Sequence, residues 1–119
     1  MAEEQRLGSI EISPVAIASL ASQAVLGCYG VVGMASRTLR DGIAELLHPS
    51  ESPRKGVQVG LEDDRITVDL FVILEYGVRV SEVAHNITQS VKFNVEKTLG
   101  VPVTEVNVHV QGLRISDPG

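Results

Sequence analysis

The stretch ITVDLFVILEYG (residues 66–77) opens the block that decides the fold, and VRVSEVAHNITQSVKFNVEKTLG (78–100) and VPVTEVNVHVQGL (101–113) complete it. In the first and last stretches apolar residues alternate with polar ones, as in strands that bury one face. In the middle stretch apolar residues recur at helical spacing: Val80, Val83, Ala84, Ile87, Val91, Val95 and Leu99. The block therefore predicts a strand, a long helix ended by Gly100, and a second strand.

Upstream of this block the sequence predicts another helix and further strands. The serine-proline pair at 13–14 suits the first positions of a helix, and Gly27 suits a left-handed residue at its end. Leu7–Ile12 alternates as a short strand before this helix. Val57–Leu61 alternates as the first arm of a hairpin that leads into the block.

The segment between the first helix and the hairpin is expected to hold a short helix over Thr38–Leu47 and an exposed loop over His48–Lys55. The main elements then follow the order β-α-β-β-α-β. This order predicts an α+β fold, a two-layer sandwich in which two main helices lie on one face of a mostly antiparallel sheet, closed as a split β-α-β arrangement. We expect a single domain over residues 1–119, with its core at about 8–113.

Composition narrows the classes of function. The chain has 119 residues, a formal net charge of −5, 3% aromatic residues and one cysteine, Cys28. An acidic balance and few aromatic side chains weigh against nucleic acid, which is bound through basic groups and base stacking. One cysteine excludes an internal disulfide and a cysteine-rich zinc site, as in proteins of a reducing cytoplasm. The first residues show no secretory signal, and the longest apolar run, Leu70–Leu74, is too short to span a bilayer. We therefore expect a cytoplasmic protein that reaches a membrane only through a partner.

The order of several short pieces resembles the alkaline shock protein family of small bacterial stress proteins. The pieces are GSIEISPVAIASLASQAV, GCYGVVGM, KGVQV and the block from ITVDLFVILEYG to VNVHVQGL, which together span residues 8–113. The resemblance implies a cytoplasmic scaffold or self-associating protein linked to cell-envelope or alkaline stress. It also implies that some members are tethered to the membrane by a separate anchor protein. No catalytic residues are attributed to the family, so none carries over to this chain.

Two groupings of titratable residues have the outline of a metal or catalytic site. Glu82 and His85 have the spacing of a di-metal ligand pair, but no second copy of the motif exists and both lie outside the apolar stripe. Glu105 and His109 share the outward face of the last strand and are placed to meet Asp69, yet no nucleophile or oxyanion site accompanies them. Both groupings are better explained as solvated polar side chains. We therefore expect no catalytic residue, no metal site, no cofactor and no enzyme activity.

A KH-like nucleic-acid-binding module is the alternative hypothesis. The sequence GVVG at 30–33 has the G-x-x-G form of the phosphate-clamping loop of KH domains, with Gly30 and Gly33 at its ends. Nearby basic residues would supply the contacts to phosphate: Arg37, Arg40, Arg54 and Lys55. The two central valines and the net charge weigh against this hypothesis. The glycines are better explained by the reversal of the chain after the first helix.

Three apolar side chains do not fit a single buried face. Phe71 and Ile73 point away from the buried row of their strand, and Phe93 falls opposite the apolar stripe of its helix. Either the short helix predicted at Thr38–Leu47 covers Phe71 and Ile73, or these residues form a contact surface. The sequence therefore predicts a non-enzymatic interaction protein that binds other copies of itself or an envelope-associated partner.

Overall fold

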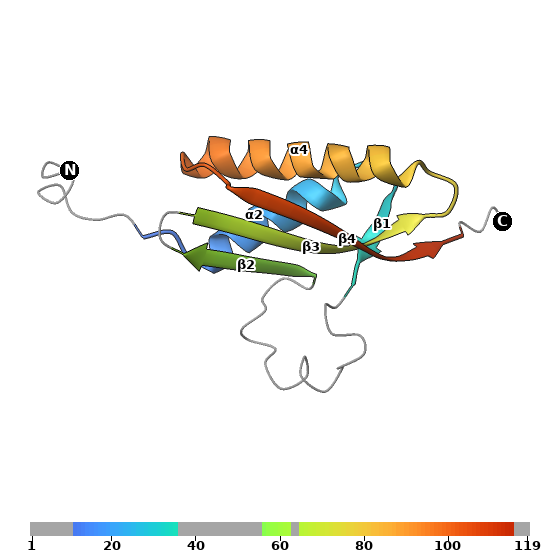
Figure 1. The fold of residues 1–119 in the computed structure, drawn as a ribbon, viewed down its shortest axis with the longest axis horizontal. Coiled ribbons are helices and arrows are strands. Elements are labelled where there is room, and N and C mark those ends of the chain that lie inside the picture. The colour runs from blue at the N-terminus through green and yellow to red at the C-terminus, as the bar shows by residue number, and fades with distance from the viewer. Residues whose placement is uncertain (1–10, 36–55, 63–64, 116–119) are drawn as a thin grey trace, which may run out of the picture.

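The described part of the computed structural model, residues 11–35, 56–62 and 65–115, consists of two helices and four strands (Figure 1). In chain order they are α2 (Pro14–Leu26), β1 (Val31–Met34), β2 (Val57–Glu62), β3 (Arg65–Glu75), α4 (Val80–Leu99) and β4 (Glu105–Arg114). The helix predicted at Thr38–Leu47 and the loop after it lie outside the described residues. So do most residues of the strand predicted at Leu7–Ile12, whose last two residues are described and are not in a strand.

The strand β3 is the centre of the sheet, because the other three strands all pair with it. β2 pairs with its first half (Arg65–Leu70) and β1 with its last part (Val72–Leu74), both antiparallel. β4 pairs with it in parallel over Thr67–Glu75. The residues of β3 that pair with β4 overlap those that pair with β1 and those that pair with β2. β4 must therefore occupy one edge of β3 alone. β1 and β2 therefore lie end to end along the opposite edge.

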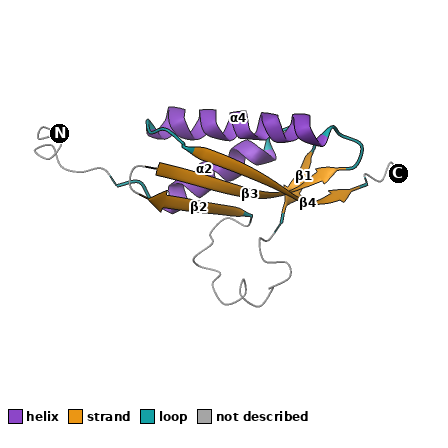
Figure 2. Ribbon diagram, in the orientation of Figure 1, coloured by secondary structure: helices purple, strands orange, loops and turns teal. Residues whose placement is uncertain are grey.

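Both helices lie on one face of this sheet and contact each other (Figure 2). The side chains between the layers form one buried cluster, to which β3 contributes every second residue and each helix contributes one stripe. Its members include Ile17, Ala21 and Val25 of α2, Ile66, Val68, Leu70, Val72 and Leu74 of β3, and Val83, Ile87, Val91 and Val95 of α4. The predicted fold class, a two-layer α+β sandwich with a mostly antiparallel sheet and its main helices on one face, is confirmed.

The position of β4 differs from the split arrangement expected from the sequence. β4 lies directly beside β3 and parallel to it, so the two strands and α4 form a plain β-α-β crossover. α4 has 20 residues and is therefore about 30 Å long, which is enough to return the chain to the start of β3. Glu96 fixes this return, because its Oε2 accepts a hydrogen bond of 2.8 Å from the backbone N–H of Val103 in the link to β4.

The helix ends follow the sequence signals with one exception. The hydroxyl of Ser13 accepts a hydrogen bond of 2.9 Å from the N–H of Val15 and so caps the start of α2. Gly100 ends α4 in the left-handed conformation, with φ +74°, and its N–H donates to Glu96 O. Gly27 also ends its helix, but its φ is −88°, so the left-handed conformation predicted there is wrong. The chain instead continues its right-handed turn for one more residue.

Gly56 lies at the junction where β1 and β2 meet along the edge of β3. Its carbonyl accepts a hydrogen bond of 2.8 Å from Phe71 N–H, and Phe71 O accepts one of 2.8 Å from Ala35 N–H. Gly56 has φ +83°, and a Cβ there would come within 2.9 Å of both Met34 Cβ and Phe71 O. Only glycine fits, because both the backbone angle and the space exclude a side chain.

We expect Gly56→Ala to lower the free energy of unfolding by about 2–4 kcal/mol, since it combines backbone strain with contacts in a packed junction. Chemical denaturation monitored by circular dichroism measures the change. Gly33→Ala is the matched control, because a Cβ at Gly33 meets nothing within 4 Å. Equal stability of the two variants would contradict this account of the junction.

Candidate interaction surfaces

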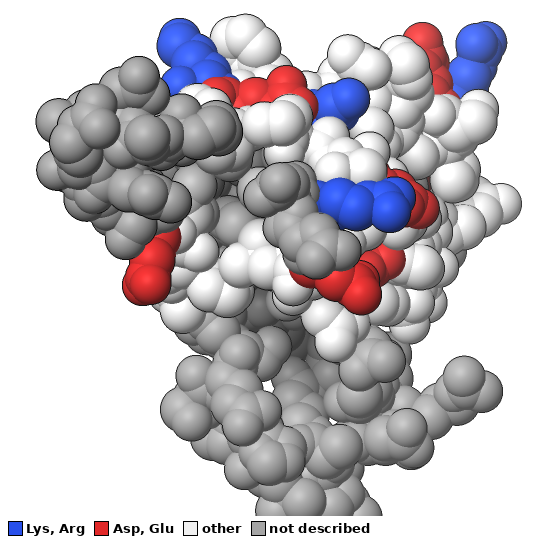
Figure 3. Space-filling view, turned by 60° about the vertical axis from the view of Figure 1, so that its left-hand side comes forward, with Lys and Arg blue, Asp and Glu red and all other residues white. Residues whose placement is uncertain are grey.

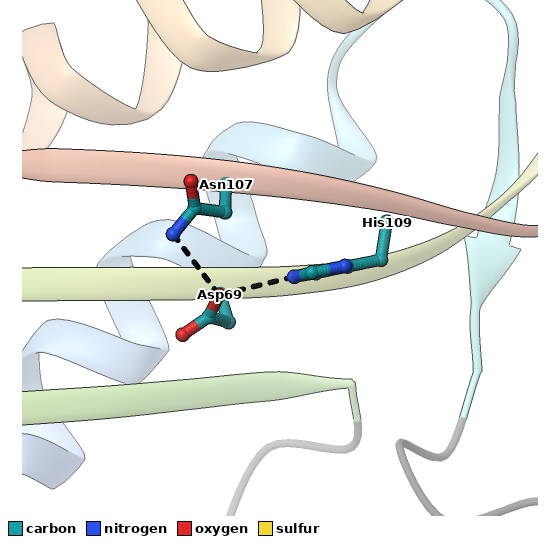
Figure 4. A network of polar contacts seen from close by, with 3 residues as sticks. All are labelled: Asp69, Asn107 and His109. Atoms are coloured by element: carbon teal, nitrogen blue, oxygen red, sulfur yellow. Dashed lines mark hydrogen bonds and ion pairs between the residues drawn. The ribbon is translucent and has the colours of Figure 1, made fainter.

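The sheet face opposite the helices holds a network of polar side chains centred on Asp69 (Figure 4). Strand alternation puts Asp69 of β3 on this face, and the strand registers put Asn107 of β4 on one side of it and Gln58 of β2 on the other. Asp69 Oδ1 accepts a hydrogen bond of 3.2 Å from Asn107 Nδ2 and lies 3.0 Å from His109 Nε2. The carboxylate therefore ties β3 to β4 through side chains in addition to the backbone ladder.

Phe71 lies on the same face, as the alternation predicts, but it is not available to a partner. Its ring stacks on the ring of His109, with centroids 4.5 Å apart and planes 10° apart, and only 9% of the residue is exposed. The parallel register brings these two side chains opposite each other. Ile73, two residues on, is half-buried. The helix that was expected to cover both lies outside the described residues.

Phe93 lies on a different side of the molecule. It is on the outer face of α4, away from the sheet, and 61% of it is exposed. Lys97 Nζ lies 5.4 Å from the centre of its ring, a cation–π distance. Phe71, Ile73 and Phe93 therefore do not form one continuous surface. The prediction that Phe93 points away from the core agrees with its place on α4.

The two titratable groupings have different outcomes in the structure. Glu82 and His85 are both exposed on the outer side of α4. His109 does meet Asp69, as its strand position indicated, and Asn107 joins them. Among the residues that the structure describes, no group of three or more His, Cys, Asp or Glu side chains could hold a metal ion. One face of the His109 imidazole stacks on the ring of Phe71, and its Nε2 contacts the carboxylate of Asp69. These two contacts hold β3 and β4 together.

The structure gives no support to the KH-like hypothesis. A KH clamp loop joins two helices, whereas Gly30 ends the turn after α2 and Gly33 lies inside β1, opposite Ile73. The carbonyl of Gly30 accepts a hydrogen bond of 2.8 Å from Glu75 N–H, so this segment is a sheet edge. The basic residues of the hypothesis, Arg37, Arg40, Arg54 and Lys55, lie outside the described residues. On the face seen in Figure 3, Lys and Arg side chains stand among Asp and Glu and form no patch of one sign.

Exposed apolar side chains that the sequence did not bring together gather at one end of the molecule. At this end β1, the last residues of β3 and β4, the end of α2 and the start of α4 come together (Figure 1). Most large apolar side chains that are exposed in the described residues belong here, the exceptions being Val15, Leu61 and Phe93. We call this group of side chains the apolar end; it comprises Leu26, Tyr29, Val32, Tyr76, Val80, Val110, Leu113 and Ile115.

Sequence patterns missed the apolar end because its members come from separate elements. The alternation of the last strand predicts that Val110 lies inward with Val106 and Val108, yet Val110 is exposed in the structure. Tyr29 is 80% exposed in the turn before β1, and Tyr76 follows directly after β3. One signal was available: Leu113 and Ile115 are apolar but follow Gly112, beyond the regular alternation.

The comparison with protein-family models gives a match over nearly the whole chain. A family model described as having a cell envelope-related function matches residues 2–115. The chain belongs to the alkaline shock protein family. The family resemblance that the ordered sequence pieces indicated is therefore confirmed.

Relatives within the alkaline shock protein family differ in length and in what their names say. The uncharacterized protein YloU of Bacillus subtilis is 44% identical over 95% of this chain and 94% of its own length. The uncharacterized protein Spy1614 of Streptococcus pyogenes is 41% identical over 91% of this chain and 89% of its own length. A stress response regulator gls24 homolog of Streptococcus pyogenes is 31% identical over 85% of this chain, which covers 54% of that protein. No solved structure gives a significant match.

The family's envelope connection raises the question of membrane contact. Among the described residues, no helix is both long enough and apolar enough to cross a bilayer.

We expect Phe71→Ala to lower the free energy of unfolding by about 2–4 kcal/mol, because it removes a buried ring and the stack on His109. Phe93→Ala on the exposed face of α4 is expected to change it by less than about 0.5 kcal/mol. Urea denaturation of both variants measures the difference. A small effect of Phe71→Ala would show that Phe71 is accessible and return it to the set of contact residues.

Proposed function

We propose that this member of the alkaline shock protein family is a non-enzymatic cytoplasmic scaffold of the cell-envelope or alkaline stress response. It acts by binding other copies of itself and, through them, an envelope-associated protein. The family's envelope-related function and the stress response relative support this context. The protein reaches the membrane through that partner.

The apolar end is the observation that carries the proposal. Large exposed apolar surfaces on a folded protein generally mark sites of contact, because burying them is favourable by roughly 25 cal/mol per Å². Tyrosines are frequent at such sites because they combine a large apolar ring with a polar tip, and the apolar end has both Tyr29 and Tyr76 at its surface. A scaffold needs a surface of this kind, whereas an enzyme would need a polar cleft.

The polar network supports the non-enzymatic part of the proposal. The titratable pair that most resembles catalytic machinery is Asp69 with His109, and both side chains make contacts within the sheet. A general base needs a proton to remove from a substrate within hydrogen-bonding distance. The Nε2 of His109 already faces Asp69, and one face of its ring is covered by Phe71.

We expect Leu113→Glu to weaken self-association about tenfold or more, because it places a charge in the apolar end that must lose water on contact. Leu61→Glu is the matched control: Leu113 is 51% exposed and Leu61 46%, both lie in strands, and Leu61 is outside the apolar end. Sedimentation velocity over a wide range of protein concentrations measures the mass distribution. Circular dichroism melts establish that both variants remain folded.

Two results would overturn the proposal. The first is a wild-type chain that is a monomer at every concentration. The second is equal self-association of Leu113→Glu and Leu61→Glu. In the first case the chain has no self-association to explain. In the second case the apolar end does not carry it.

A further inference from the structure

The backbone hydrogen bonds of β3 determine which groups of β4 face its outer edge. Phe71 donates its N–H to Gly56 O and accepts from Ala35 N–H, so both of its backbone groups are directed toward β1 and β2. Glu75, four residues on, donates its N–H to Gly30 O on the same side. Because backbone groups alternate along a strand, the even-numbered residues of β3 direct theirs toward β4.

The parallel register then assigns the backbone groups of β4. Asn107 lies opposite Asp69, whose own groups point away from β4. In a parallel ladder Asn107 must therefore bond to the two neighbours of Asp69, and residues 105 and 109 bond to β3 in the same way. The register shifts after residue 110, so the regular run ends there. The groups that point to the outer edge belong to Val106, Val108 and Val110.

This edge lacks the features with which proteins usually prevent the addition of a strand. Such features are lysines, prolines, very short strands and covering segments. Within the described residues β4 pairs only with β3, and its ten residues include neither lysine nor proline. The opposite side of the sheet is divided between β1 with four residues and β2 with six. The outer edge of β4 is therefore the longest continuous edge of the described sheet.

The helix layer is wider than the sheet beneath it. α4 packs over β4, and α2 packs over β1 and β2 (Figure 1). Two neighbouring helices span about 20 Å, whereas three strands span about 14 Å. The difference is close to the width of one strand, and α4 carries part of it beyond β4. Val106 and Val108 point toward the helices but are only partly buried, and Val110 is 36% exposed. A further strand would cover all three side chains.

A strand that carries its own helix does not fit beside β4. The added strand would lie about 4.8 Å from β4, so a helix packed over it would lie at a similar distance from α4. Packed helices need a separation of about 8–10 Å. Every edge strand of a second copy lies under one of its helices. The edge therefore accepts a single extended segment and not the sheet of a second copy.

The side chains beside the edge indicate what the segment carries. Its residues opposite the three valines point to the helix side, where apolar groups extend the core. Its alternate residues point to the other face of the sheet, beside the exposed carboxylate of Glu105, with Asp69 one strand further in. The chain as a whole has a net charge of −5. Lysine or arginine at the alternate positions is complementary, because long side chains reach diagonal neighbours on the next strand.

We propose that the outer edge of β4 binds an extended segment of a partner protein as a further strand, and that this segment alternates apolar with basic residues. The backbone groups of the three valines supply about six hydrogen bonds to it. The inference rests on the partner binding of the proposed function and names the surface and the chemistry for it. Cytoplasmic segments of membrane proteins are rich in lysine and arginine, which agrees with an envelope-associated partner. The apolar end is left for contact between copies.

Amide hydrogen exchange measured by NMR tests the geometry. The probe is a synthetic peptide of about nine residues, within the usual length of a strand, in which valine and lysine alternate. In the free protein we expect the amides of Val106, Val108 and Val110 to exchange faster than those of Asn107 and His109, which bond to β3. Bound peptide should slow the three valine amides about tenfold or more. A peptide of the same sequence with methylated backbone nitrogens keeps the side chains but cannot pair, and should give no protection.

Reversal of one charge beside the edge tests the chemistry of the segment. We expect Glu105→Lys to weaken binding of the valine-lysine peptide about fivefold or more at low salt, because attraction is replaced by repulsion. Glu62→Lys is the matched control: it makes the same change of charge at an exposed strand residue, but on β2. Its affinity should stay within about twofold of the wild type. Isothermal titration measures both, and circular dichroism melts establish that both variants are folded.

Failure of this inference is distinguishable from failure of the proposed function. The edge site is overturned if the peptide shows no saturable binding up to about 1 mM, if it binds without slowing the valine amides, or if Glu105→Lys and Glu62→Lys bind it equally. None of these results changes the self-association of the wild-type chain. Conversely, a chain that is monomeric throughout but whose valine amides the peptide protects would overturn self-association and support the edge site.

Discussion

The burial of one side of β3 is the constraint on which the other elements depend. Ile66, Val68, Leu70, Val72 and Leu74 are at most 6% exposed, and each pairing of the sheet is made to this one strand. β3 has strands on both sides, each about 4.8 Å away, and a single helix about 10 Å across does not cover all of them. α2 and α4 therefore lie together on the same face, and each has to present an uninterrupted apolar stripe to it. A polar substitution in the row of β3 would leave an unpaired group between both helices and the sheet.

Local sequence patterns predicted the helices and strands. The neighbours of each strand and the burial of single side chains depend on long-range pairing, which local patterns do not contain. The alternation from Ile66 to Leu74 and the helical stripe from Val80 to Leu99 depend on neighbours in the chain, so both were read correctly from the sequence. The neighbour of β4 depends on where α4 delivers the chain, and the expected split arrangement gave way to direct contact with β3. The burial of Phe71 depends on His109, a residue 38 positions away that the parallel register brings into contact.

The sheet face opposite the helices shows how a wet face can be ordered without a second layer. A carboxylate on the central strand accepts from Asn107 and His109 on its neighbour, and an aromatic ring covers the imidazole. These contacts join side chains that the backbone ladder already holds in register, so little further entropy is lost in forming them. They also place an apolar ring, Phe71, against a polar one, His109. Sequence reasoning treated Phe71 and the Asp69–His109 grouping as separate features, whereas they form a single cluster.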